Sequence, residues 1–209
     1  MSILANMVLQ SCINSFGTVA VASWTAFGKV DGFYWMISGA FGVSITTFVS
    51  QNFGAGKYDR IRQGVKVCLG VTFAVTAVVS LLYCFGAGLL LRMFSSDLAV
   101  IDLGIHMMWF TSPFYFTFVC IEIFSGAARG TGDSLRPTLL TCFGVCVLRV
   151  VWVLVVLPHI PVLETVLVSY PVSWVVTSIL YLVYYFRGNW LRRSIKRAGM
   201  SAEEAAAVK

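Results

Sequence analysis

Long apolar runs separated by short polar segments dominate the pattern of this chain. An α-helix needs about 20 mostly apolar residues to cross the hydrocarbon core of a bilayer. Six runs approach or exceed that length: Ser2–Ala22, Phe33–Ser50, Val65–Phe94, Ile105–Arg129, Thr138–Leu157 and Val166–Phe186. The pattern therefore predicts an all-α integral membrane protein with six transmembrane helices.

The composition supports a membrane protein and excludes an ordinary soluble domain. The 209 residues are 58% hydrophobic and 11% charged, whereas soluble domains have about 45–50% and about 25%. All six cysteines fall inside the apolar runs without CxxC spacing. We interpret them as small buried apolar side chains rather than disulfides or metal ligands.

The Lys and Arg residues are divided unequally between the two ends of the predicted helices. Twelve of the fifteen belong to segments on one side, Lys29 and Arg92 to the other, and Arg149 to the fifth run. Because basic residues accumulate on the cytoplasmic side, we expect both termini to be cytoplasmic. A six-helix bundle at residues 1–186 is expected to precede a basic tail at 187–209. The net charge of +6 then requires no nucleic-acid partner.

A row of polar residues marks the first run. Asn6, Gln10 and Asn14 recur every four residues, which places them on one face of a helix. Polar groups inside a bilayer usually face protein or a water-filled cavity. The row therefore predicts either the lining of a substrate cavity or hydrogen bonds between helices, and the pattern does not choose between them.

Glu122 is the one carboxylate that this assignment puts well inside an apolar run. Such a group can exchange a proton or bind Na⁺ on one side of the membrane, as ion-coupled transport requires. The alternative is a structural ion pair, for which Arg149 on the next predicted helix is the candidate. The chain contains none of the common catalytic motifs, so we do not expect an enzyme.

Several segments resemble bacterial transporters of the MATE (multidrug and toxic compound extrusion) family. They are INSFG, VAVASWTAFGKVDGF, FGVSITTFVSQNFGAGKYDRIRQG and IFSGAARGTGDSLRP, and the loops at Gln51–Gly64 and Gly126–Pro137 are the most specific. The resemblance implies the C-terminal six-helix lobe of a two-lobe transporter in a bacterial inner membrane. It further implies efflux of amphipathic or cationic compounds in exchange for Na⁺ or H⁺, with no other cofactor.

The resemblance also bears on the site and on the partners. The family often has an acidic residue in its tenth helix, which corresponds to the fourth predicted helix here, and Glu122 is the acid in that helix. The first lobe is missing, which suggests a fragment that acts with a separate N-terminal lobe or with a second copy. The alternatives are a lipid-linked saccharide flippase, with more cationic residues in its cavity than Arg149 alone, and a truncated, non-transporting membrane fragment.

Overall fold

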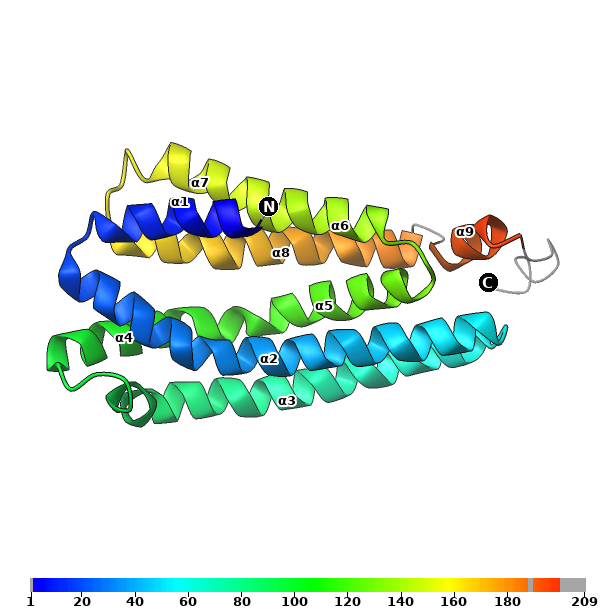
Figure 1. Ribbon diagram of the computed structural model, residues 1–209, viewed down its shortest axis with the longest axis horizontal. Coiled ribbons are helices and arrows are strands. Elements are labelled where there is room, and N and C mark those ends of the chain that lie inside the picture. Colours follow the sequence, from blue (N-terminus) through cyan, green and yellow to red (C-terminus); the bar gives the residue numbers. More distant parts are fainter. Residues whose placement is uncertain (1, 188–189, 200–209) are drawn as a thin grey trace.

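The computed structural model describes residues 2–187 and 190–199, and within these ranges the regular structure is entirely helical (Figure 1). The elements are α1 Ser2–Asn14, α2 Thr18–Gly54, α3 Tyr58–Arg92, α4 Leu98–Thr111, η1 Ser112–Phe114, α5 Tyr115–Gly130, α6 Leu135–Thr141, η2 Cys142–Val147, α7 Leu148–Val156, α8 Leu163–Arg187 and α9 Trp190–Arg197. Five stretches of the described chain are long and apolar enough to cross a membrane: α2, α3, α4 to α5, α6 to α7, and α8. The predicted all-α membrane fold is confirmed.

The predicted boundary between the first two runs is wrong. Instead of a polar connection near Lys29, the chain leaves the helix earlier, at Gly17, whose φ of 93° suits glycine. The following helix, α2, then continues for 37 residues. Its first turns stay inside the bundle because their polar groups find partners there; Ser23 Oγ, for example, donates to the carbonyl of Val100 at 3.1 Å. As a result, Asp31 lies within a membrane-spanning helix.

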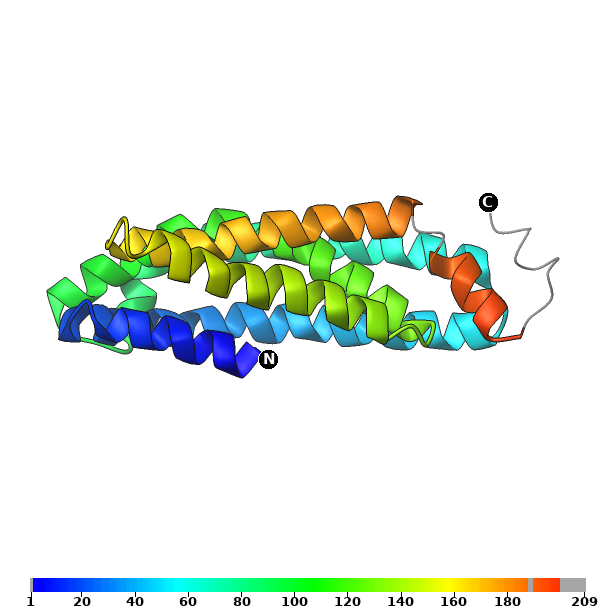
Figure 2. The same ribbon diagram turned by 90° about the horizontal axis from the view of Figure 1, so that it is seen from above.

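The helices form two groups, one above the other in Figure 1, so that one group overlies the other in the view from above (Figure 2). One group consists of α2, α3 and the α4 to α5 stretch, and the other of α1, the α6 to α7 stretch and α8. Contacts between α5 and α8 join the groups. Large aromatic side chains fill the interior, and Tyr34, Tyr115, Trp174 and Tyr181 are among the largest fully buried ones.

Large apolar side chains also cover the outside of the bundle. Met36, Phe85, Leu89 and Phe186 are each at least 73% exposed. In water these side chains would be unfavourable, whereas lipid tails solvate them without penalty. The outer surface is therefore that of an integral membrane protein.

Two of the membrane-spanning stretches depart from regular α-helix. The 3₁₀ turn η1, which contains Pro113, joins α4 to α5, and proline removes a backbone donor from the helix. The π-helical segment η2 joins α6 to α7. A π-helical turn accommodates an extra residue, and such turns frequently occur at functional sites.

Helices α2 and α5 approach closely at two glycines on α5. A Cβ atom on Gly126 would lie 2.9 Å from the carbonyl oxygen of Gly42, and one on Gly130 would lie 2.6 Å from that of Thr46. The hydroxyl of Thr46 also donates to the Gly126 carbonyl at 3.1 Å. Small residues four apart allow this kind of backbone contact between membrane helices.

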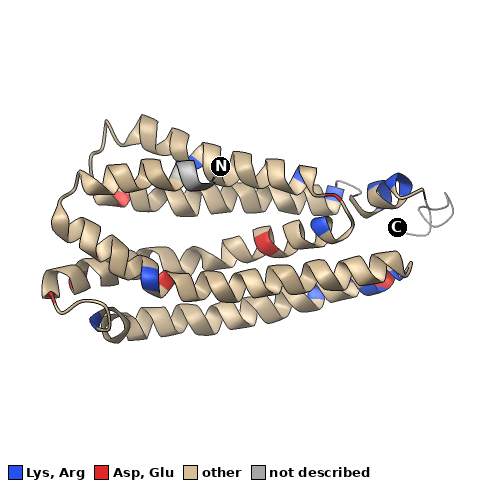
Figure 3. Ribbon diagram, viewed as in Figure 1, with Lys and Arg blue, Asp and Glu red and all other residues tan. Residues whose placement is uncertain are grey.

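The two glycine-rich loops lie at the same end of the bundle, where most Lys and Arg residues gather (Figure 3). The second loop is held by α9, part of the predicted tail. Ser194 and Thr131 hydroxyls are 3.0 Å apart, and Arg197 is 3.4 Å from the buried carboxylate of Asp133. The first turns of this tail are thus a docked helix, and residues 200–209 lie outside the described residues.

Candidate functional site

A cavity of about 580 Å³ lies between the two groups of helices. Its polar lining consists of Asn6, Gln10, Asp31, Thr141, Cys146 and Arg149. Its aromatic lining consists of Trp24, Trp35, Phe118, Tyr170 and Trp174. Pockets of this size, with mostly apolar walls and a few polar groups, are typical of small-molecule sites.

Asp31 supplies the negative charge of this cavity. Its carboxylate accepts hydrogen bonds from the hydroxyl of Tyr115, on α5, and from the indole N–H of Trp35, at 2.5 Å. Trp35 can reach the carboxylate because it is four residues further along the same helix. The two donors fix the carboxylate where α2 faces α5.

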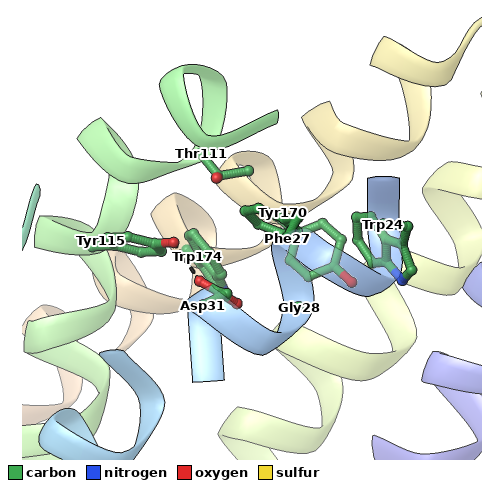
Figure 4. Close-up of a pocket in the computed structure, with 8 residues that line it drawn as sticks. All are labelled: Trp24, Phe27, Gly28, Asp31, Thr111, Tyr115, Tyr170 and Trp174. Atoms are coloured by element: carbon green, nitrogen blue, oxygen red, sulfur yellow. Dashed lines mark hydrogen bonds between the residues drawn. The ribbon is translucent and has the colours of Figure 1, made fainter. Parts of the chain in front are cut away.

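Tyr115 is itself held in place by aromatic packing. The Tyr34 ring stacks on it with ring centroids 4.0 Å apart, and the Tyr34 hydroxyl donates to the Tyr115 carbonyl at 3.2 Å. A smaller cavity of about 90 Å³ is lined by Tyr115 and Asp31 among others (Figure 4). Asp31, Trp24, Tyr170 and Trp174 line both cavities. The carboxylate therefore faces two hollows bounded largely by aromatic rings.

Arg149, on α7, supplies the positive charge of the larger cavity. The residue is 6% exposed. Its Nη2 donates to the hydroxyl of Ser173 at 3.1 Å, and its guanidinium carbon lies 3.8 Å from the centroid of the Tyr170 ring. This is a cation–π contact that fixes the plane of the group. Within the described chain, no carboxylate lies within ion-pair distance of Arg149, and its Nε has no hydrogen-bond partner.

Glu122 lies outside this cavity, so the predicted pairing with Arg149 is wrong. Its Oε1 is 3.6 Å from Nη2 of Arg129, seven residues further along the same stretch of helix. Its side chain packs directly against Gly42 of α2, where an added Cβ would overlap the carboxylate. Arg129 is near enough to neutralise Glu122 without any contribution from α7.

The polar row of α1 is divided between the two predicted roles. Asn6 and Gln10 line the larger cavity. Asn14 does not; its Oδ1 accepts a hydrogen bond from Nε2 of Gln10 at 3.0 Å. Of the five residues that the sequence singled out, three therefore meet at one cavity, together with Asp31.

Sequence reasoning missed Asp31 because it assigned the segment around GKVDG to an external connection. A signal was present: Asp31 and Trp35 have the spacing of neighbours on a helix face, and the apolar residues around them continue on both sides. The hydrogen bond that keeps Asp31 inside comes from Tyr115, 84 positions away, and no local pattern indicates such a partner.

Proteins that resemble this chain are multidrug resistance proteins and related transporters. This chain is 26% identical over 196 residues to the probable multidrug resistance protein YoeA of Bacillus subtilis (strain 168). The match covers 93% of this chain and 42% of that protein. The chain is 28% identical over 163 residues to the probable multidrug resistance protein NorM of Thermotoga maritima, covering 75% of this chain and 34% of that protein. The chain thus spans less than half the length of these relatives.

Solved structures share the fold. One is a transporter of the MOP superfamily from Pyrococcus furiosus, with a TM-score of 0.80 and 19% identity over 88% of this chain and 41% of that one. Another is a multidrug resistance MATE family transporter in an outward-facing conformation, with a TM-score of 0.81 and 18% identity over the same shares. The MatE family model matches residues 1–155. The chain belongs to the MatE family.

Proposed function

We propose that this chain forms one lobe of a secondary active efflux antiporter, which exports amphipathic or cationic compounds in exchange for Na⁺ or H⁺. The observation that carries the proposal is Asp31, a carboxylate held by Tyr115 and Trp35 at the wall of an aromatic cavity. Intramembrane carboxylates that face a cavity typically mark ion or substrate pathways. The names of the curated relatives support the multidrug assignment.

Exchange requires that ion and substrate compete for the same group. A proton or Na⁺ on Asp31 removes the negative charge that would attract a cationic compound, and a bound cation in turn excludes the coupling ion. Trp24 and Trp174 line both cavities, and aromatic rings attract organic cations through their faces. Antiport then follows if the cavity opens alternately to the two sides of the membrane.

Alternating access takes two bundles that rock around a central site. The chain offers one bundle, so we expect it to work with a separate N-terminal lobe or with a second copy in a bacterial inner membrane. We place the two glycine-rich loops and α9 in the cytoplasm, because the basic residues gather at that end (Figure 3).

Glu122 remains a second candidate for coupling. Its ion pair is with Arg129, one residue before the end of α5, and neither residue lines the aromatic cavity. We rank Asp31 first because it lines the cavity itself. A lipid-linked saccharide flippase is disfavoured. The diphosphate of such a lipid would need several cationic side chains, and Arg149 is the one cationic residue in the described lining of the cavity.

The test is ion-driven efflux of ethidium from cells that express the chain alone or with a separate N-terminal lobe. Asp31→Asn should lower the Na⁺- or H⁺-driven rate at least ten-fold, because the amide can neither bind the ion nor release a proton. Asp102→Asn is the matched control, since Asp102 is an exposed acid on α4. Undiminished ion-driven efflux by Asp31→Asn would overturn the coupling role of Asp31. A lack of efflux both from the chain alone and from the chain with the N-terminal lobe would overturn the transport proposal.

A further inference from the structure

Arg149 is the buried charge that the proposed efflux of cations does not use. Arginine stays protonated in proteins, and a buried charge is costly unless it is paired and hydrogen-bonded. Here the described chain provides only neutral partners, the Ser173 hydroxyl and the face of Tyr170. The Nε–H remains without an acceptor although it is buried. The guanidinium is therefore fixed in place but incompletely satisfied, and it lines a cavity large enough for a ligand.

We propose that Arg149 is a binding site for the carboxylate of a substrate, so that this cavity selects zwitterionic amphipathic compounds over simple cations. The inference rests on the proposed function for the identity of the cavity as the substrate site. The planar guanidinium presents paired N–H donors that match the two oxygens of a carboxylate. A bound carboxylate would give the Nε–H its missing acceptor.

The negative charge of Asp31 in the same cavity as Arg149 indicates that the ligand is a zwitterion rather than an anion. Asp31 and Arg149 are the two charged residues of the described lining, so their formal charges cancel. A ligand with one positive and one negative group leaves neither residue unpaired. A simple cation satisfies Asp31 and leaves Arg149 uncompensated, and a simple anion does the reverse. The aromatic walls then hold the apolar body that links the two ligand groups.

The test compares two forms of one dye on the purified chain in a nonionic detergent. A rhodamine with a free benzoate is a zwitterion, and its methyl ester is a cation of nearly the same shape. Fluorescence anisotropy should show that the wild-type chain binds the free acid at least ten-fold more tightly than the ester, as expected for a charge-assisted contact with a carboxylate. Arg149→Gln should abolish this preference by weakening binding of the acid without weakening binding of the ester, and Arg149→Lys should retain part of the preference.

Three further measurements complete the design. Binding of the ester by each variant shows that the cavity is still folded. Arg92→Gln, at the exposed end of α3, is the control for a general loss of positive charge. Equal binding of acid and ester by the wild type, or equal weakening of both in Arg149→Gln, would overturn the proposal. Competition by anionic phosphatidylglycerol would also overturn it, because Arg149 would then hold a lipid headgroup.

Failure of this inference is distinguishable from failure of the proposed function. If Arg149 sets the preference for the acid but neither ethidium nor the free-acid rhodamine is exported, the carboxylate site stands and the transport proposal falls. If efflux depends on Asp31 but the dyes bind alike, transport stands and the zwitterion preference is wrong.

Discussion

The close contact between α2 and α5 predicts that Gly126→Ala destabilises the bundle. The new methyl carbon would lie 2.7 Å from Cγ2 of Ile45 and 2.9 Å from the carbonyl oxygen of Gly42, whereas ordinary contacts begin at 3.4 Å. One of these atoms is backbone and the other belongs to a β-branched side chain with little rotamer freedom. The helices must therefore separate by about 0.5 Å or more, given those distances.

The separation has a further cost that the structure allows us to estimate. It stretches the hydrogen bond from Thr46 to the Gly126 carbonyl, now 3.1 Å, beyond useful length, and such bonds between membrane helices contribute about 0.6 kcal/mol. Overpacking costs about 1–3 kcal/mol. Alanine recovers about 1 kcal/mol through its higher helix propensity. The net loss is about 0.6–2.6 kcal/mol of unfolding free energy, by the same magnitudes.

The measurement is unfolding of the chain by SDS in mixed micelles, followed by tryptophan fluorescence. Gly39→Ala is the matched control on α2, because a Cβ there meets nothing within 4 Å. It should leave the stability unchanged or raise it slightly through helix propensity. If Gly126→Ala is as stable as Gly39→Ala, the close approach of the two helices is not what holds this part of the bundle together.

Three other predictions follow from the same contacts. Tyr115→Phe removes one of the two hydrogen bonds to Asp31 and should slow ion-driven efflux several-fold, at unchanged expression, without abolishing it; a rate equal to that of the wild type would mean that the bond does not position the carboxylate. Arg129→Gln breaks the ion pair with Glu122 and, since the arginine is 40% exposed, should cost less than about 1 kcal/mol in the same SDS titration; a larger loss would show that Glu122 depends on this partner. In a background without native cysteines, Lys57→Cys and Arg136→Cys should resist an impermeant thiol reagent applied to intact cells, whereas Ser96→Cys at the opposite end should react, and the reverse pattern would invert the topology.

The class of fold and much of the site could be predicted from sequence because the bilayer imposes simple rules. Long apolar runs indicate spanning helices, and costly polar residues within them indicate a cavity. Asn6, Gln10 and Arg149 were found in this way, and the structure brings all three to one cavity. Each is a polar or charged residue within an apolar run, so the neighbouring sequence was sufficient to identify it.

Tertiary partners explain what the sequence could not show. Lys29, Asp31 and the flanking glycines resemble an external connection, but a hydroxyl from α5 satisfies the carboxylate and lets the helix continue. For Glu122, the sequence offered Arg149 on the next predicted helix as a candidate partner, whereas the long side chain of Arg129 reaches back along its own helix. In both cases the deciding contact depends on packing in three dimensions.

The π-helical segment η2 makes the cavity wall sensitive to residue number as well as residue type. Val145 and Cys146 reach the cavity from η2 itself, and Thr141 and Arg149 reach it from the helices on either side. The orientation of Arg149 relative to Thr141 depends on the extra residue that the wide turn accommodates. Deleting one residue between Cys142 and Val147 would give a regular helix and leave the residues beyond it close to their present orientation. If the same residues instead formed a regular α-helix, everything beyond the turn would rotate by about 100° and Arg149 would turn away from the cavity. When relatives are aligned through this helix, a single-residue gap therefore decides which of their side chains stands where Arg149 does.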